Sequence, residues 1–171
     1  ELNNLENFEI FKLSSNQAVD LLDLQQNYRV EPGAVIREKV ILEKDAIVLM
    51  NATINIGARI GEKSMIDMGA IIGSRAQIGK NCHIGANAVI AGVLEPESSK
   101  PVTIEDDVFV GANSVVLEGV TIGHDSIIGA MTLVNKDIPP YSLAIGVPCR
   151  IEKRVDEKLK EKCKNNPLLR K

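Results

Sequence analysis

Aliphatic residues recur at every sixth position along most of this chain. In blocks of six that start at Val30, the first position is aliphatic in eleven consecutive blocks, up to Ile90. The fifth position holds Ala, Ser or Cys in nine of these eleven blocks. The pattern resumes at Ile104 and continues to Val134, where six of six first positions are aliphatic. Such a regular spacing predicts a repeat architecture.

The six-residue period is incompatible with a helix and typical of short strands. On an α-helix, positions six apart lie about 240° apart, so no apolar stripe could form. In a strand, residues separated by an even number share a face, so the first and fifth positions of a block can both point inward before Gly, Asn or Asp turns the corner. Three such blocks close one triangular turn of a parallel β-helix. The period leaves the hand of the coil open, and parallel crossovers are ordinarily right-handed.

The repeat also indicates how the chain is divided. Ile90 and Ile104 are 14 positions apart instead of six, which predicts an extruded loop at about 91–103. We therefore expect a β-helix over 30–151, preceded by a helical segment over 1–29 and followed by a C-terminal helix over 152–171.

The two flanking helices are predicted from their own apolar spacing. In the first, Ser15 is the expected cap of a helix that runs to Gln26, with apolar residues on one face. In the second, Val155, Leu159 and Cys163 follow one another at four-residue intervals among Lys and Glu, as on a surface helix. We interpret its charged residues as a solvated face.

Composition narrows the possible partners and compartments. The chain of 171 residues is 44% apolar and has a net charge of −3, with no basic stripe, three Phe, two Tyr and no Trp. These features argue against nucleic acid as a partner. No apolar run approaches the roughly 18 residues of a membrane span, and no signal segment opens the chain, so we expect a cytoplasmic protein, or a plastid stromal one if a transit peptide was removed. The three cysteines have unrelated spacings and are expected to be reduced thiols.

Two sequence segments add a family resemblance. The hexapeptide pattern, together with NKDIPPYSLAIGVPCRIEKR at 135–154, resembles the hexapeptide-repeat acyltransferases, which are left-handed parallel β-helix enzymes that act as trimers on acyl-CoA. The run from 62 to 123 and the VEPGAVIRE motif at 30–38 are similar to the tetrahydrodipicolinate N-acyltransferases of lysine and diaminopimelate biosynthesis, closest to the N-acetyltransferase branch. The chain differs from that branch in its shorter N-terminus and in GSRAQ at 73–77, where GGRAT is common.

This resemblance implies an all-β, left-handed β-helix and a specific reaction. Acetyl-CoA would donate its acetyl group to the amino group of an amino-ketopimelate formed from tetrahydrodipicolinate, and no metal is required. Both substrates would bind between neighbouring β-helices of a homotrimer, with the CoA arm along one face under the extruded loop. The amine would attack the thioester directly while a base takes its proton and backbone N–H groups stabilise the oxyanion. Cys82, in a small inward position, is not expected to act as a nucleophile.

Two residues are candidates for catalysis. Asp67 matches the aspartate proposed as catalytic in the related succinyltransferases, although acidic residues are also ordinary corner formers at its position. Their second carboxylate is missing, because Val115 falls at that place, and Glu118 occupies another position of its block. His83 faces outward and can accept a proton near neutral pH, as hexapeptide acyltransferases often require, although outward histidines are often inert. We interpret His124 as a turn residue.

The candidate binding residues each have a structural alternative. Ser74 and Arg75 could hold an acceptor carboxylate, or Arg75 could simply be solvated. The CoA candidates comprise small residues that let a pantetheine arm approach the backbone, basic residues for phosphates, and the proline of the GVPCR segment. Repeat packing alone could also explain the small residues. The CoA candidates are Gly92, Gly111, Ala112, Gly129, Ala130, Lys136, Pro148 and Arg150.

The sequence leaves some other functions open and excludes one by its number of histidines. A γ-type carbonic anhydrase needs three zinc-binding histidines, and the chain has two. An ice-binding β-helix would present flat Thr arrays, whereas the outward positions here are mixed. Another N-acetyltransferase, acting on an amino sugar or a different amine, and a non-catalytic paralogue are the remaining alternatives.

Overall fold

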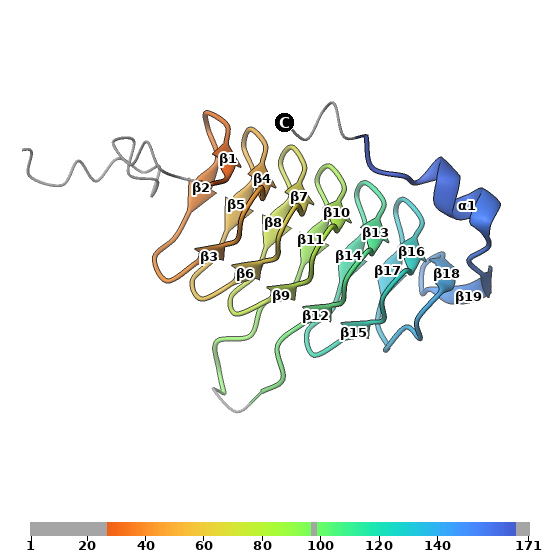
Figure 1. Ribbon diagram of the computed structural model, residues 1–171. Coiled ribbons are helices and arrows are strands. Elements are labelled where there is room, and N and C mark those ends of the chain that lie inside the picture. Colours follow the sequence, from red (N-terminus) through yellow and green to blue (C-terminus); the bar gives the residue numbers. More distant parts are fainter. Residues whose placement is uncertain (1–26, 97–98, 167–171) are drawn as a thin grey trace, which may run out of the picture.

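The computed structural model describes residues 27–96 and 99–166, and these form a three-sided coil of short parallel strands (Figure 1). From β1 to β17, paired strands are three apart along the chain, so each turn contributes one strand to each of three sheets. The hexapeptide repeats wind as a left-handed parallel β-helix, as the family resemblance implied. The predicted N-terminal helix over 15–26 lies outside the described residues.

The three sheets are the faces of the prism, and we name them A, B and C. Sheet A contains β1 (Arg29–Val30), β4 (Ile47–Val48), β7 (Met65–Ile66), β10 (His83–Ile84), β13 (Phe109–Val110), β16 (Ile127–Ile128), β18 (Ser142–Ile145) and β19 (Arg150–Arg154). Sheet B contains β2 (Val35–Ile36), β5 (Thr53–Ile54), β8 (Ile71–Ile72), β11 (Val89–Ile90), β14 (Val115–Val116) and β17 (Leu133–Val134). Sheet C contains β3 (Ile41–Leu42), β6 (Arg59–Ile60), β9 (Gln77–Ile78), β12 (Thr103–Ile104) and β15 (Thr121–Ile122).

The core consists of the first and fifth positions of the blocks, as the period predicted. Ile54, Ile66 and Ile84 are all 0% exposed, and so are the small fifth-position residues Ala70 and Cys82. Large and small side chains thus share the narrow interior of the prism, which packs without room for bulkier residues.

The corners depend on the fourth position of each block, where the backbone turns through the left-handed region. Glycine and asparagine adopt this conformation most readily, and they are frequent at this position. Lysine, arginine and methionine occur there as well. The non-glycine fourth-position residues with positive φ are Lys39, Asp45, Asn51, Lys63, Arg75, Asn81, Asn87, Asp107, Asn113, Asp125 and Met131.

The predicted loop leaves the coil at the corner between sheets B and C, after β11 (Figure 1). The strand that follows it, β12, pairs with β9 in register, so the coil resumes in sheet C without losing a strand. The loop is therefore a lengthened corner, and it ends one residue earlier than predicted, because Thr103 already belongs to β12.

The prediction of a helix over 152–171 is wrong at its start. Residues Arg150–Arg154 form β19, which pairs antiparallel with β18. The reason is that β18 ends the stack of parallel strands and would otherwise present unpaired backbone groups. The helix α1 is short, Glu157–Lys162, and is capped by Asp156, whose side chain accepts a hydrogen bond from the backbone N–H of Leu159. No helix in the described part of the chain is long and apolar enough to span a membrane.

Candidate active site

The two residues predicted to be catalytic lie next to each other. Asp67 follows β7 at the corner between sheets A and B, and His83 opens β10, the neighbouring strand of sheet A. The parallel register places Ile66 opposite Ile84. Asp67, which follows Ile66, therefore lies close to His83, which precedes Ile84. Oδ2 of Asp67 lies 3.6 Å from Nε2 of His83. The two side chains are only 20% and 22% exposed.

Asp67 also stabilises its own corner. Its Oδ1 accepts a hydrogen bond of 2.7 Å from the backbone N–H of Met68, a local contact typical of aspartate in turns. This contact fixes the carboxylate so that its other oxygen faces His83. The two interpretations of Asp67, corner former and site residue, are therefore compatible in one geometry.

The ring of His83 is stacked on Phe109, a residue that the sequence analysis did not single out. The two residues are in register on adjacent strands of sheet A. Their ring centroids lie 4.9 Å apart, with 14° between the planes. Phe109 occupies the same outward position as His83 one turn later, once the eight extra residues of the loop are discounted, so the repeat itself could have identified it.

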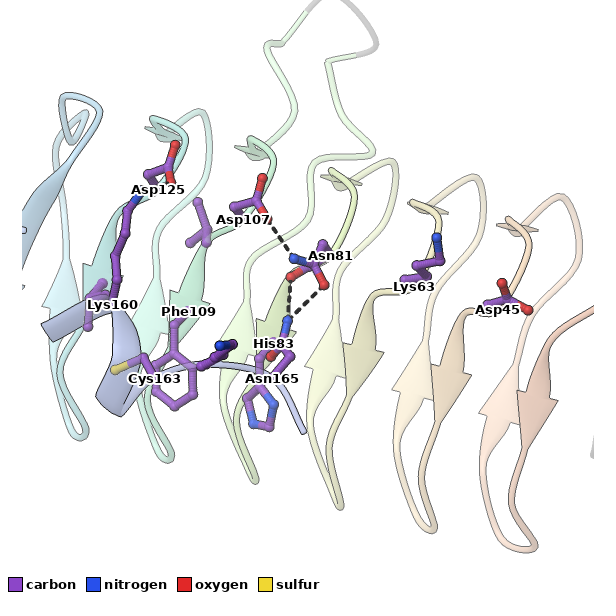
Figure 2. Close-up of a pocket in the computed structure, with 13 residues that line it drawn as sticks. Asp45, Lys63, Asn81, His83, Asp107, Phe109, Asp125, Lys160, Cys163 and Asn165 are labelled. Carbon is purple, nitrogen blue, oxygen red and sulfur yellow. Dashed lines mark hydrogen bonds and ion pairs between the residues drawn. The ribbon is translucent and has the colours of Figure 1, made fainter. Parts of the chain in front are cut away.

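His83 and Phe109 line a cavity of about 540 Å³ on sheet A (Figure 2). One edge of this cavity is a row of fourth-position residues from successive turns, Asp45, Lys63, Asn81, Asp107 and Asp125. The other wall comes from the C-terminal segment, through Lys160, Cys163, Lys164 and Asn165. The expectation of a solvated helix face missed this packing, because nothing in a surface-helix pattern shows which element the helix will contact.

Polar contacts attach the C-terminal segment to the edge of sheet A. The side-chain amide of Asn165 donates to both oxygens of Asn81, at 2.8 and 3.0 Å, and Asn81 donates in turn to Asp107 (Figure 2). Lys160 pairs with Asp125. Burial opposes the charge on Asp125, but bonds from His124 and Lys160 outweigh it and lower the pKa of this carboxyl.

The predicted acceptor-binding pair lies at a different corner. Ser74 and Arg75 follow β8 in the corner between sheets B and C, next to the base of the extruded loop. Ser74 is 3% exposed, and its carbonyl accepts a hydrogen bond from the backbone N–H of Val93. The structure therefore does not bring this pair together with Asp67 and His83, and its role in acceptor binding stays a prediction.

The CoA candidates fall into two groups. Gly92 and Lys136 lie in corners between sheets B and C. Four small residues lie instead in corners between sheets A and B, along the same edge as Asp67 but nearer the C-terminal end. This second group is the column of small residues, Gly111, Ala112, Gly129 and Ala130. Pro148 and Arg150 lie in and just after the turn that joins β18 to β19, where the carbonyl of Gly146 accepts a hydrogen bond from the N–H of Leu133 in β17.

Coil packing supplies its own reason for two of these glycines. A Cβ built on Gly111 would overlap the backbone nitrogen of Ala130, and one on Gly92 would overlap that of Ser74. Glycine is therefore required at both positions by the close approach of neighbouring turns. This requirement does not test their role toward CoA.

Comparisons with known families and proteins show what this chain is similar to. The sequence matches the bacterial transferase hexapeptide family over residues 57–92 and 101–136, and the hexapeptide repeat of succinyl-transferase over residues 39–74. It is 53% identical to a 2,3,4,5-tetrahydropyridine-2,6-dicarboxylate N-acetyltransferase of Alkaliphilus metalliredigens, over 93% of this chain and 68% of that protein. The protein of the same name from Halalkalibacterium halodurans is 50% identical, over 91% and 65%. The chain thus spans about two thirds of the length of these relatives.

Two solved acetyltransferase structures are similar to this chain. A single-histidine variant of perosamine N-acetyltransferase from Caulobacter crescentus, in complex with CoA and GDP-perosamine, is 34% identical, with a TM-score of 0.65 over 72% of this chain and 57% of that one. The acetyltransferase domain of a Neisseria gonorrhoeae protein, in complex with acetyl coenzyme A, shares the fold with a TM-score of 0.66 at 17% identity, over 73% of this chain and 57% of that one.

Proposed function

Because the chain belongs to the tetrahydrodipicolinate N-acetyltransferase family of hexapeptide-repeat proteins, we propose that it transfers an acetyl group from acetyl-CoA to the amino group of an amino-ketopimelate formed from tetrahydrodipicolinate. The names of relatives at 53% and 50% identity support this reaction and its place in lysine and diaminopimelate biosynthesis. The structural observation that carries the proposal is the contact between Asp67 and His83, which provides a proton acceptor beside a carboxylate.

The reaction needs only a base and a positioned thioester. The acceptor nitrogen attacks the thioester carbonyl carbon, a carbon–nitrogen bond forms, and His83 takes the proton that the nitrogen loses. The carboxylate of Asp67 faces the imidazole and stabilises the positive charge that it acquires. When the tetrahedral intermediate collapses, the carbon–sulfur bond breaks, and His83 returns the proton to the sulfur of CoA. No acyl-enzyme intermediate is formed.

The column of small residues supports a position for the pantetheine arm. It begins two turns after the corner of Asp67, occupies the corners after β13 and β16, and ends near the turn that contains Pro148. Side chains as small as Gly and Ala let a thin, extended ligand lie against the backbone. Lys136 and Arg150 are both exposed and could contact the phosphates of CoA. CoA and acetyl-CoA in the solved relatives support acetyl-CoA as the donor.

A homotrimer is supported by the character of sheet B. Its outward residues are aliphatic in five of six strands, and Ile71 is 46% exposed. Met68 and Met131, at the adjoining corner with sheet A, are 46% and 69% exposed. An apolar face of this kind is expected to be covered by another subunit. The active site would then lie between neighbouring β-helices.

One observation favours a second acceptor class. The solved relative with 34% identity was crystallised with GDP-perosamine, a nucleotide-linked amino sugar. An amino sugar is therefore the second candidate acceptor for this chain.

The test is release of free CoA, followed with a thiol reagent. Wild-type protein is incubated with acetyl-CoA or succinyl-CoA and with tetrahydrodipicolinate, and parallel reactions contain nucleotide-linked amino sugars. Turnover in the reaction with acetyl-CoA and tetrahydrodipicolinate, and in no other, supports the proposal. Turnover with amino sugars alone would move the assignment to the second candidate. Tight binding of acetyl-CoA without turnover for any amine would indicate a non-catalytic paralogue.

A further inference from the structure

We propose that Phe109 is a positioning residue, which holds the imidazole ring of His83 in the orientation needed for proton transfer. This role rests on the proposed acetyl transfer, because it assigns to Phe109 an effect on the base of that reaction. The claim goes beyond the shape of the fold, since the outward positions of a β-helix can hold many residue types.

The ladder of sheet A confines His83 from both sides. In register with it are Met65 on β7 and Phe109 on β13. Met65 is 8% exposed although it occupies an outward position. The ring of Phe109 lies nearly parallel to the imidazole, at 14°, with 4.9 Å between centroids. Asp67 approaches the same imidazole from the neighbouring corner, at 3.6 Å from Nε2.

The backbone of a strand fixes the position of the histidine Cα atom but not the orientation of the imidazole ring. The second side-chain torsion of histidine has a broad, twofold energy profile, so the backbone alone does not set the plane of the ring. A flat neighbour with parallel-stacked geometry does set it. An aliphatic residue would cover the ring without selecting its tilt. Because a misplacement of about 1 Å can reduce turnover by about 100-fold, the tilt matters for catalysis.

The residue type at position 109 is unusual within this sheet. The corresponding outward positions on the other parallel strands of sheet A are occupied by aliphatic residues, methionine or arginine, apart from His83 itself. The chain has three phenylalanines, and Phe109 alone lies in the repeat. The one phenylalanine among the outward positions compared is thus stacked on the proposed base. The other outward residues compared here are Arg29, Ile47, Met65, Ile127 and Leu143.

The kinetic test compares variants that keep the face covered but change its shape. Phe109→Leu is expected to lower kcat by about 10-fold or more while the KM for acetyl-CoA stays within about twofold, because the interaction lost acts on the reacting geometry. Phe109→Tyr keeps a flat ring and is expected to retain kcat within about threefold. Phe109→Met provides a second ringless variant if the leucine variant does not fold. Thr103→Ala, at the same block position on sheet C, is the matched control and should behave as wild type.

A spectroscopic test reads the stacking directly in the resting protein. The chain contains two histidines, so His83→Asn assigns the imidazole proton signals by their loss. The face of an aromatic ring shifts the NMR signals of protons stacked over it. Phe109→Leu and Phe109→Met should therefore move the His83 signals and leave those of His124 in place, and Phe109→Tyr should preserve both.

The two tests separate this proposal from the reaction on which it rests. If the wild type shows no turnover with any acceptor, the proposed function fails and the role of Phe109 in it fails as well. If the wild type is active and both ringless variants retain its kcat, the reaction stands and the positioning role is overturned. Loss of kcat together with a moved His83 signal, both restored in Phe109→Tyr, is the result we expect.

Discussion

The carboxylate of Asp67 lies 3.6 Å from Nε2 of His83, although 15 residues separate the two in the sequence. Their contact follows from the coil, because one turn brings β10 beside β7. If the two act as a unit, their substitutions will not be additive. His83→Ala should lower kcat by about 10²- to 10⁴-fold, the usual contribution of a general base. Asp67→Asn should cost about 10-fold, because the charge that stabilises the imidazolium is lost.

A double-mutant cycle on kcat measures this coupling. The double variant should be no more than about threefold worse than His83→Ala alone, since Asp67 has nothing to stabilise once the imidazole is gone. Asparagine at position 67 can still accept the hydrogen bond from Met68, so the corner is preserved. Fully additive effects would mean that Asp67 and His83 act independently.

The thiol of Cys82 should take no part in the reaction. Burial raises the pKa of this thiol to about 12, and its sulfur donates a hydrogen bond to the carbonyl oxygen of Glu105 at 3.0 Å. Because the thiolate is the reactive form, Cys82 should react with a thiol reagent at pH 8 only after denaturation. Cys82→Ala should retain kcat within about threefold, and abolished turnover would instead point to an acyl-enzyme.

Glycines of the coil should differ in their tolerance of substitution. Gly111→Ala places a Cβ against the backbone of the next turn, so a loss of more than about 4 kcal/mol in the free energy of unfolding is expected. Gly57 is a fourth-position corner residue where a Cβ would meet the side chain of Arg75 at 3.6 Å, an ordinary contact, and Gly57→Asn should cost less than about 1 kcal/mol. Denaturant titration compares the two. Equal losses would contradict the close packing at Gly111.

The attachment of the C-terminal segment should depend on pH in one direction. The pKa of Asp125 is lowered from its ordinary value of 3.8, so its ion pair with Lys160 stabilises the segment above that pH and is lost as the pH falls through the lower, folded-state value. Amide exchange of α1, corrected for intrinsic rates, should therefore show less protection below about pH 4 than at pH 6.

The variant Asp125→Asn should show weak protection of α1 already at pH 6. Glu161→Gln is its matched control, because Glu161 pairs only at the surface with Lys164, where both side chains are at least two-thirds exposed. Such surface pairs contribute about 0–1 kcal/mol. Unchanged exchange in Asp125→Asn would show that other contacts hold the segment.

The proposed trimer predicts opposite effects for two exposed isoleucines. Ile71 is 46% exposed on sheet B, and Ile41 is 51% exposed at the equivalent position on sheet C. Ile71→Glu should dissociate the oligomer in sedimentation experiments, because an unpaired charge buried at an interface costs several kcal/mol. Ile41→Glu should leave it intact. Dissociation by both or by neither would show that sheet B is not the specific contact.

The sequence predicted most of the coil because the physics there is local and repeated. Ile66 and Ala70 are buried for the same reason as their counterparts in every other block, so one rule places dozens of side chains. Asp67 and His83 were chosen by chemistry and family resemblance, and the structure places them together. Phe109 follows the same period but was not among the predicted site residues, because a phenyl ring carries no group that transfers a proton or binds a charged substrate.

The remainder depended on contacts that no period describes. The return of Arg150–Arg154 as a strand reflects the open edge of β18, and the packing of Asn165 against Asn81 joins residues that are 84 positions apart. A four-residue apolar spacing predicts that a helix can form, but it does not predict the surface on which that helix will lie. One wall of the cavity was therefore invisible in the sequence.

The lengthened corner between β11 and β12 can differ in length without changing the strands on either side of it. Because β12 resumes its place in sheet C with full register, the number of residues in that corner is uncoupled from the spacing of the strands before and after it. Loop length and composition can then change over evolutionary time while the distance from Asp67 to His83 stays the same. A scaffold with this modularity can vary one insertion and leave the spacing of its proposed proton-transfer pair untouched.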